Sequence, residues 1–351
     1  MPNYENGSNI ISKPLSGINY IDFLLFEDSK IWESNQITYS FPFKNSNESF
    51  FSDIYKTPAT YTWDWYNSKI FGLSNDAQIS TKKAFEEWSN VANINFIEIP
   101  EIGTNVGDIR ITHTDEYNNG VTAQDTGTLG FAYRPEYSDP LDGDIWLADW
   151  LPNNWEKGYS DNYLTILHEI GHALGLNHPQ KTDKSLDEFD FTNYTVMSYN
   201  NDKYDQGQVF FESGYEGIIN PIQTPMVYDI ATIQYLYGPN KTFNLGDNIY
   251  QFDNNKAFLK SIWDAGGNDT LDFKNFIKNC DINLEPGSYS TIRCNKWAVT
   301  DNLGIAFETY IENVIAGRGD DVISGNSLSN EINGSQGNDL ISGEKGDDIL
   351  L

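Results

Sequence analysis

Positive charge is scarce in this sequence. Its 351 residues include 22 Lys and Arg against 51 Asp and Glu, which gives a formal net charge of −29 at pH 7. Proteins that bind nucleic acid neutralise phosphates with Lys and Arg, so this charge excludes that class. The basic residues form no run, so we predict no patch for an anionic membrane surface. So large an excess of carboxylates strains a compact fold unless bound cations offset it.

Long apolar stretches are absent as well. No segment approaches the roughly 20 apolar residues of a membrane-spanning helix, so we predict no membrane span. Residues 1–17 lack a basic segment followed by an apolar core, so we predict no Sec-type signal peptide. Hydrophobic residues still make up 39% and aromatic residues 14% of the chain, which suffices for a packed core. At 351 residues we expect two domains.

Cysteine is nearly missing. The two cysteines, Cys280 and Cys294, lie in the C-terminal part and have no CxxC spacing, which argues against a cysteine-bound zinc. In a secreted protein an even pair at short separation can form a disulfide. Two free, buried thiols are the equal alternative.

Histidine is rare, yet three of the four histidines fall in one short segment. The segment HEIGHALGLNHP, residues 168–179, contains His168, His172 and His178. Residues four apart on a helix share one face, so His168 and His172 point at one spot. Gly175 lets the chain leave the helix in a conformation that other residues avoid, and the turn returns His178. Three neutral imidazoles with one open position are typical of catalytic zinc.

Glu169 follows the first of these histidines and would reach the open side of the metal. We predict that it acts as the general base. A solvated helix face is the alternative for a short HExxH pattern. The longer HExxHxxGxxH pattern fixes five positions, and a structural zinc site needs no such carboxylate. We therefore predict one catalytic zinc ion, and we expect the fourth histidine, His113, to lie on the surface.

A methionine turn follows the zinc motif. Only three methionines occur, and one of them, Met197, lies in the segment YTVMSYN. The extended zinc motif followed by such a turn is the metzincin signature. We expect Met197 to form an apolar floor under the imidazoles. A methionine that fills a gap in the core is the alternative.

Periodicity predicts a sheet and several helices. Strands are expected at residues 37–43, 94–100, 108–112, 128–135 and 144–149. Helices are expected at residues 18–26, 74–91 and 164–176, and from Thr224 as N-cap and Pro225 to Gly238. In the second helix, a core-facing stripe is expected at Ile79, Phe85, Trp88 and Val91.

The tail repeats every nine residues. Four units follow without gaps at residues 316–324, 325–333, 334–342 and 343–351. They match GGxGxDxUx, in which glycines allow tight turns, aspartates and carbonyls bind Ca²⁺, and aliphatic residues stack inside. The residues expected at several calcium sites are Gly317, Gly319, Asp321, Gly334, Gly337, Asp339, Gly343, Gly346 and Asp348, with Asp269 in an earlier isolated copy.

The second unit departs from this pattern. It has Leu328 where the others have glycine and Asn330 where they have aspartate, which puts its calcium site in doubt. A flexible linker rich in Gly, Asp and Asn is the alternative for the whole tail. The aliphatic residue at position eight of every unit argues against a linker. These residues are Ile323, Ile332, Ile341 and Leu350.

Together these motifs resemble the serralysin family of secreted bacterial metzincins. The zinc helix, the VMSY turn, the helix PMVYDIATIQYLYG, the segment WDAGGNDTLDF and the glycine-rich tail all match. The resemblance implies an α+β catalytic domain at residues 1–240, with a twisted, mostly parallel sheet and long helices. An all-β, parallel β-roll or β-sandwich domain that binds calcium would follow at residues 241–351, either short or truncated, since family members usually continue past this point.

The resemblance also implies an activity. It implies a secreted zinc endopeptidase in which Tyr199 is an extra zinc ligand that swings away when substrate binds and then stabilises the oxyanion. Peptide substrates would bind extended along an edge strand within residues 128–135, and a proteinaceous inhibitor is a second candidate partner. The resemblance further implies a monomer that a type I exporter secretes.

Two other classes are alternatives. A calcium-dependent adhesin or toxin module with structural zinc explains the repeats but not Glu169. An astacin-like or matrix-type metzincin explains the zinc helix but not the repeats.

Overall fold

The chain forms two compact units. We analysed a computed structural model, which describes residues 9–42, 70–101, 105–118, 121–136, 141–151, 154–157, 160–179, 188–200, 210–211 and 221–351. One unit comprises Met1–Ser89 and Asn93–Gln180, and the other Asn90–Ala92 and Lys181–Leu351. This division lies before the predicted domain boundary between residues 240 and 241, which stays a prediction.

A six-stranded sheet forms the centre of the first unit. Its order is β5 (Asn95–Glu98), β3 (Gln36–Ser40), β6 (Ile109–Thr114), β10 (Ile145–Ala148) and β9 (Gly130–Ala132), and β4 (Ile70–Phe71) also pairs with β6. The pairs among β5, β3, β6 and β10 are parallel, whereas β9 and β4 pair antiparallel. Every residue of β10 is buried, as in strands covered on both faces. The expected mostly parallel sheet is confirmed.

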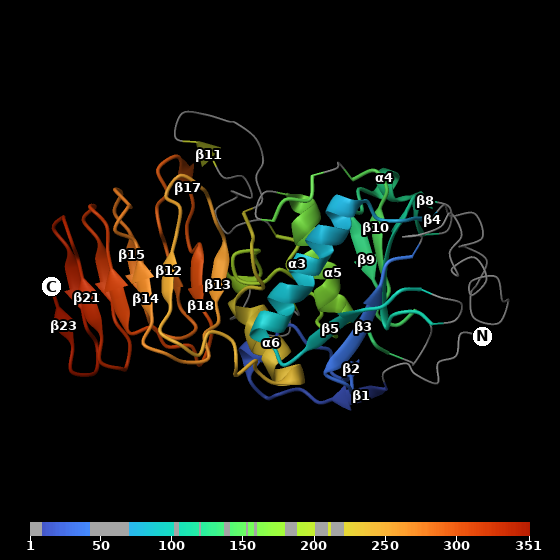
Figure 1. The fold of residues 1–351 in the computed structure, drawn as a ribbon, viewed down its shortest axis with the longest axis horizontal. Helices are drawn as coiled ribbons and strands as arrows, with labels where there is room; N and C mark the ends of the chain where they lie inside the picture. The colour runs from blue at the N-terminus through green and yellow to red at the C-terminus, as the bar shows by residue number, and fades with distance from the viewer. Residues whose placement is uncertain are drawn as a thin grey trace. The chain divides into compact units, whose positions relative to one another are not determined.

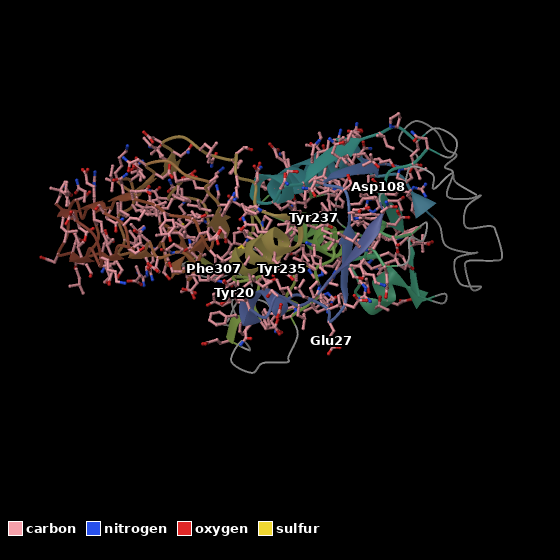
Figure 2. All side chains as sticks on the ribbon, turned by 90° about the horizontal axis from the view of Figure 1, so that it is seen from below. Tyr20, Glu27, Asp108, Tyr235, Tyr237 and Phe307 are labelled. Atoms are coloured by element: carbon pink, nitrogen blue, oxygen red, sulfur yellow. The ribbon has the colours of Figure 1, made fainter. Side chains whose placement is uncertain are left out.

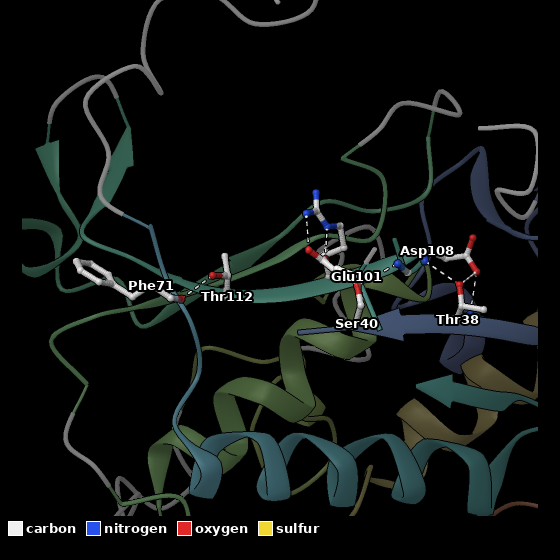
Figure 3. Close-up of polar contacts among 8 residues, drawn as sticks. Thr38, Ser40, Phe71, Glu101, Asp108 and Thr112 are labelled. Carbon is white, nitrogen blue, oxygen red and sulfur yellow. Dashed lines mark hydrogen bonds and ion pairs between the residues drawn. The ribbon is translucent and has the colours of Figure 1, made fainter. Parts of the chain in front are cut away.

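Side-chain hydrogen bonds link β3 to the start of β6 (Figure 3). Asp108 Oδ2 accepts from the backbone N of Thr38 at 2.8 Å and from its Oγ1 at 2.7 Å. Ser40 Oγ donates to Glu101 Oε1 at 2.9 Å, and Arg110 Nε donates to the same oxygen at 2.8 Å. If β3 slipped by one residue against β6, each of its side chains would turn to the opposite face of the sheet. These contacts therefore help to specify the register of the two strands.

Two long helices run side by side in this unit (Figure 1). They are α3 (Asn75–Val91) and α5 (Asp161–Ala173), and Trp88 Nε1 of α3 donates to Leu167 O of α5 at 3.1 Å. The predicted stripe on α3 is correct for Phe85, Trp88 and Val91, which are buried. It is wrong for Ile79, which is 52% exposed. At about 100° per residue, Ile79 lies at least about 120° around the helix from the other three.

The N-terminal segment supports the end of α5. Strands β1 (Ile10–Lys13) and β2 (Ser29–Trp32) pair antiparallel, and between them only α1 (Asn19–Asp22) is helical, less than the predicted residues 18–26. Trp32 Nε1 donates to Ala173 O at 2.9 Å. Short elements β7 (Glu116–Asn118), β8 (Val121–Thr122) and α4 (Ala123–Thr126) complete the described part of this unit.

Short parallel strands dominate the second unit (Figure 1). One sheet has the order β12 (Ile249–Gln251), β14 (Thr270–Asp272), β19 (Asn313–Ile315), β21 (Glu331–Asn333) and β23 (Ile349–Leu350). Another has the order β15 (Asp281–Asn283), β20 (Val322–Ser324) and β22 (Leu340–Ser342). All pairs in both sheets are parallel, which confirms the β-roll. The other strands are β13 (Lys260–Ile262), β18 (Leu303–Ile305), β16 (Tyr289–Ser290), β11 (Phe210–Phe211) and β17 (Trp297–Ala298).

Equivalent repeat positions stack 18 residues apart. Ile332 pairs with Leu350 in one sheet, and Ile323 pairs with Ile341 in the other. A nine-residue unit is therefore half a coil, and successive units supply strands to opposite sheets. Ile323 and Ile332 are buried as predicted, but Leu350 is 47% exposed. The prediction that every position-eight residue is inside is wrong there, because β23 is the last strand of its sheet.

The helix α6 (Val227–Tyr237) also belongs to the second unit, and its residues Tyr235 and Tyr237 are labelled in Figure 2. It ends at Gly238 as predicted, but the predicted N-cap Thr224 is wrong, since the helix begins after Met226. Met226 N donates to Asp229 Oδ2 at 2.8 Å, so a carboxylate inside the first turn satisfies this donor.

Both cysteines are free thiols in the structure, and both are buried. Burial raises the pKa of Cys280 to about 11 and that of Cys294 to about 12. Their Sγ atoms lie 3.5 Å from Lys278 O and 3.1 Å from Lys256 O, respectively. Of the two alternatives, the structure therefore has the free, buried thiols.

Candidate metal centre

The helix α5 positions the first two histidines. Ser160 is its N-cap, and its Oγ accepts a hydrogen bond from Tyr163 N at 3.2 Å. Asp161 in the first turn interacts favourably with the helix dipole. The helix therefore begins three residues before the predicted residue 164. It presents His168 and His172 one turn apart, as the spacing predicted.

The turn after α5 returns the third histidine. Gly175 has a φ of +102°, and a Cβ at this position would lie 2.6 Å from Lys30 O. Leu176 N donates to Gly171 O at 3.0 Å, so the carbonyls at the helix end are satisfied while the chain reverses. The prediction that glycine is needed to leave the helix is confirmed.

The three imidazoles converge. The Nε2 atoms of His172 and His178 are 2.9 Å apart, and those of His178 and His168 are 3.3 Å apart. Nitrogens that bind one tetrahedral zinc at about 2.0–2.1 Å are about 3.4 Å from each other. Among the described residues, these three form the only group of His, Cys, Asp or Glu side chains with three ligand atoms this close together.

The protonation of His172 suits a metal ligand. Its Nδ1 lies 2.9 Å from Leu176 O, and because a carbonyl only accepts, Nδ1 bears the hydrogen and Nε2 presents its lone pair. Burial holds the pKa of His172 well below its usual value, and the neighbouring His168 and His178 lower it further. The ring is thus neutral, the form that binds a divalent cation.

Glu169 lies beside this cluster in the chain and is 4% exposed. Burial raises the pKa of its carboxyl to about 8. Its Oε2 is buried and has no hydrogen-bond partner among the described residues. An unpaired buried carboxylate oxygen is costly, so its presence in the motif points to a ligand or reactant that the protein binds there.

The methionine turn belongs to the second unit and is held by Asp229. Thr195 Oγ1 donates to Asp229 Oδ1 at 2.6 Å, and Val196 N donates to Oδ2 at 2.8 Å. Met197 N donates to Thr195 Oγ1 at 3.0 Å, and Met197 is fully buried. Tyr199 follows with 76% of its surface exposed. The roles predicted for Met197 as a floor and Tyr199 as a ligand remain predictions.

Asp229 is a residue that sequence analysis missed. It is fully buried, and burial raises its pKa to about 7 although three hydrogen bonds lower it. A sequence signal existed, because Asp229 is the only charged residue of α6. A lone carboxylate in an apolar helix indicates a polar partner from elsewhere in the fold.

The expectation that His113 lies on the surface is wrong. Its ring is half-buried, 5.8 Å from the Trp155 ring between centroids, and Nδ1 lies 3.2 Å from Ala148 O. Burial lowers its pKa. His113 lies on β6 at the centre of the sheet, which explains its burial.

The repeat carboxylates form a ladder between turns. Asp321 Oδ1 accepts from Cys280 N at 2.6 Å, and Asp339 Oδ1 accepts from Asp321 N at 2.9 Å. On the other edge of the roll, Asp348 Oδ1 accepts from Asn330 N at 2.9 Å. Each of these three carboxylates retains oxygen lone pairs for a cation.

The predicted repeat glycines allow close approach of the backbone. A Cβ at Gly337 would lie 2.1 Å from Gly319 O, and one at Gly343 would lie 2.3 Å from Asp348 Oδ2. The other predicted glycines are equally crowded by backbone or carboxylate atoms within 2.6 Å; these are Gly317, Gly319, Gly334 and Gly346. Glycine therefore brings carbonyls and carboxylates of successive turns together, a donor set of hard oxygens that suits Ca²⁺.

The isolated early copy has its own acidic cluster. Asp269 is fully buried, and burial raises its pKa to about 6, with the charge of Asp264 contributing. Asp269 Oδ1 accepts from Asn248 N at 2.8 Å, whereas Oδ2 has no partner among the described residues. Two neighbouring buried carboxylates with an unpaired oxygen fit a cation.

Amide groups replace carboxylates in the divergent unit. Asn330 Nδ2 donates to Glu312 O at 3.2 Å and Ile311 O at 3.4 Å, and Asn326 Nδ2 donates to Ile311 O at 2.8 Å. Asn330 Oδ1 accepts from Asn326 N at 2.8 Å. Both asparagines are buried. Their N–H groups thus donate to carbonyls at this turn, and the doubt about a calcium site in this unit stands.

Comparison with known families matches both parts of the chain. Residues 54–205, which include the histidines and the methionine turn, match the model of the Matrixin family. Residues 228–350 match the family model described as Peptidase M10 serralysin C terminal.

Several curated proteins are similar over most of this chain. A serralysin of Proteus mirabilis is 33% identical over 86% of this chain and 62% of its own length. Serralysin C of Dickeya chrysanthemi is 33% identical over 91% of this chain and 66% of its own length. Metallopeptidase AprA of Pseudomonas marginalis is 34% identical over 74% of this chain and 57% of its own length. The chain thus spans about three fifths of the length of the relatives it matches. None of the described helices has the length and apolar character needed to cross a membrane.

Proposed function

Because the chain belongs to the serralysin family, we propose that it is a zinc-dependent endopeptidase whose site is formed by His168, His172, His178 and Glu169. The observation that supports this best is the convergence of three imidazole Nε2 atoms next to a buried, unpartnered carboxylate. A structural metal site would not need that carboxylate.

The three imidazoles would hold the metal through Nε2. When bound there, zinc supplies a Lewis acid that polarises the scissile carbonyl and lowers the pKa of water. The carbonyl of Leu176 fixes the tautomer of His172. The Gly175 turn sets the direction from which His178 approaches.

Glu169 acts as the general base. Its carboxylate takes a proton from the attacking water and passes it to the nitrogen of the leaving amine. Burial alone favours the protonated form of Glu169, with a pKa of about 8. A divalent cation nearby favours the charged form, so metal binding and base function depend on each other.

Tyr199 donates its phenol hydrogen to the developing oxyanion. Its side chain is 76% accessible, so an arriving substrate can reach the phenol. In the absence of substrate, the family resemblance assigns the phenol oxygen to the metal.

The substrate binds as an extended peptide along β9. Among the described strands, β9 is the last in the order of its sheet and pairs with β10 along one edge, so its other edge is where we place the substrate backbone. Gly130 packs against α5, where its Cβ would lie 3.0 Å from Thr165 Cγ2. The edge therefore runs directly beside the helix of the metal ligands. Backbone hydrogen bonds give affinity with little sequence preference.

The second unit binds several calcium ions between its turns. Asp321, Asp339, Asp348 and Asp269, with carbonyls of the repeat glycines, supply the oxygens. Extracellular calcium is high enough to fill such weak sites, whereas cytosolic calcium is not. This suits a secreted monomer that a type I exporter translocates unfolded.

Casein cleavage by wild type and Glu169→Gln, with zinc content measured on the same preparations, tests the proposal. We expect Glu169→Gln to retain zinc and to lose activity by about 10³-fold or more. A chelator should abolish wild-type activity, and added zinc should restore it. Activity of Glu169→Gln within tenfold of wild type would contradict the assigned role.

A further inference from the structure

Arg134 lies where the edge strand leaves the sheet, on the side that faces α5. A Cβ at Gly130 points at Thr165 of α5, 3.0 Å from its Cγ2. Alternate residues of a strand point to the same side, so Ala132 and then Arg134 face α5 as well. The strand pairing continues through Tyr133, whose N donates to the carbonyl opposite at 2.9 Å. Arg134 is therefore the first long side chain on this side, after a glycine and an alanine.

Strand β9 packs against α5, the helix that carries His168 and His172. Arg134 therefore lies on the same side of the edge strand as these two histidines.

Two neighbours hold the guanidinium while leaving it accessible. Its Cζ lies 3.7 Å from the centroid of the Phe26 ring, and Nη2 donates to Glu136 Oε1 at 3.0 Å. The side chain is 35% exposed. A guanidinium has five N–H donors, and the bond to Glu136 uses one of them. Stacking on one face orients the guanidinium, so its edge can bind another carboxylate.

We propose that Arg134 is a specificity-determining residue that binds the side-chain carboxylate of an Asp or Glu in the substrate peptide. This inference rests on the proposed endopeptidase function. A peptide paired with β9 presents alternate side chains toward α5, and the one beyond Ala132 meets Arg134. The net charge of −29 repels acidic peptides at long range. A preference for one acidic position therefore needs a local cation, and the sequence has only four arginines.

The test uses end-capped, internally quenched peptides with a single cleavage site. At each of four positions on either side of the scissile bond, Glu is compared with its neutral isostere Gln, as a ratio of kcat/KM. Capped ends remove the terminal carboxylate of the peptide, which could otherwise bind Arg134 in place of the side chain. We expect one position where wild type prefers Glu about tenfold, the effect of one hydrogen bond to a charged group. No position with a ratio above about two would overturn the proposal.

Variants assign the preference to the guanidinium. Arg134→Met should reduce the ratio at that position to about one, and Arg134→Lys should retain only part of it, because Lys lacks the planar fork. Glu136→Gln removes the competing carboxylate and should raise the ratio. The control Arg318→Met removes an exposed cation of the second unit and should leave the ratio unchanged.

The ratio does not depend on the amount of folded enzyme, since both peptides are assayed on one preparation. If Arg134→Met retains the full wild-type ratio, Arg134 is only a structural partner of Glu136, and the proposal is wrong. If wild type with bound zinc cleaves none of the peptides or casein, the proposed function itself fails, and this inference fails with it.

Discussion

Asp229 shows how much can depend on one buried residue. Its two oxygens accept from Thr195, Val196 and Met226, so a single carboxylate joins the methionine turn to the start of α6. The side chain is fully buried. Each of the three donors would therefore lose its partner if the carboxylate were removed.

Replacing Asp229 should separate its geometry from its charge. Asp229→Ala leaves three buried donors unsatisfied and should lower the free energy of unfolding by about 4 kcal/mol. Asp229→Asn preserves the shape and should cost about 1 kcal/mol. Urea unfolding of the two variants gives both values. Equal stability of Asp229→Ala and wild type would mean that water replaces the carboxylate.

Burial of the Asp229 carboxyl should also make the stability of the folded protein depend on pH. Its pKa is raised from 3.8 to about 7 in the folded protein, so between these values the folded state binds the extra proton. Stability from this group is complete below pH 3.8 and is lost as pH rises through about 7. The stability of wild type relative to Asp229→Asn should therefore fall over this range. A flat difference would contradict the raised pKa.

Tyr199→Phe should reduce activity without removing zinc. The phenol hydrogen is one of two groups that stabilise the oxyanion, so its loss should lower kcat by about 10²-fold, less than Glu169→Gln. Tyr310→Phe, at another exposed tyrosine, is the matched control and should have no effect. Loss of zinc from Tyr199→Phe would make Tyr199 chiefly a structural ligand.

At residue level, the sequence predicted which side chains form the metal site better than it predicted how deeply side chains are buried. His168, His172 and His178 converge as their spacing required, because helical periodicity and one glycine determine where they point. His113 was misplaced because its burial follows from the order of strands, which no local pattern contains. Arg134 was missed for a similar reason, since Phe26, on which it stacks, comes from a distant segment.

At the level of elements, the sequence predicted the types well and the ends poorly. α5 begins at Asp161 and α6 at Val227, two or three residues from the predicted starts. In both cases a side-chain oxygen that accepts a backbone hydrogen bond determines the start, that of Ser160 from Tyr163 N and that of Asp229 from Met226 N. The nine-residue period was visible, but the 18-residue stacking was not, because pairing between coils is a tertiary property.

The divergent turn of the roll gives a prediction for an element. Asn330→Asp removes the amide donors to Ile311 O and Glu312 O and buries a new carboxylate, so it should destabilise the calcium-free protein by about 3 kcal/mol. Added calcium should recover part of this loss, since the new carboxylate and the released carbonyls can bind it. Thermal unfolding in EGTA and in calcium measures both effects.

The matched control for this turn is Gln336→Glu, which adds the same charge at an exposed loop position. It should change stability by less than about 0.5 kcal/mol in either condition. An Asn330→Asp variant as stable as wild type in EGTA would show that the amides are not needed there.

For the whole molecule, charge is the dominant property. The net charge of −29 includes carboxylates that successive turns of the roll bring together, and they repel one another without cations. Composition predicts a need for cations and the repeats predict where they would bind, and both stay predictions. The division of the chain at residues 180 and 181 could not be predicted, because it depends on which segments pack together.

Calcium should accordingly stabilise the whole chain. A weak extracellular-type site contributes about 1 kcal/mol at a few millimolar calcium, and each kcal/mol raises Tm by about 2–4 °C. Several sites together should raise Tm by about 10 °C between EGTA and 5 mM calcium, and magnesium at the same concentration should do much less. An unchanged Tm and circular dichroism spectrum would mean that the repeats bind no calcium.

The most direct test of the account is X-ray absorption at the zinc edge on purified protein, with zinc content from the same sample. The account predicts one zinc per chain with three imidazole nitrogens at about 2.0–2.1 Å. His178→Ala should lose one nitrogen and most of the zinc affinity, whereas His113→Ala should retain the wild-type spectrum. Absence of zinc, sulfur ligands at about 2.3 Å, or an unchanged spectrum in His178→Ala would contradict it.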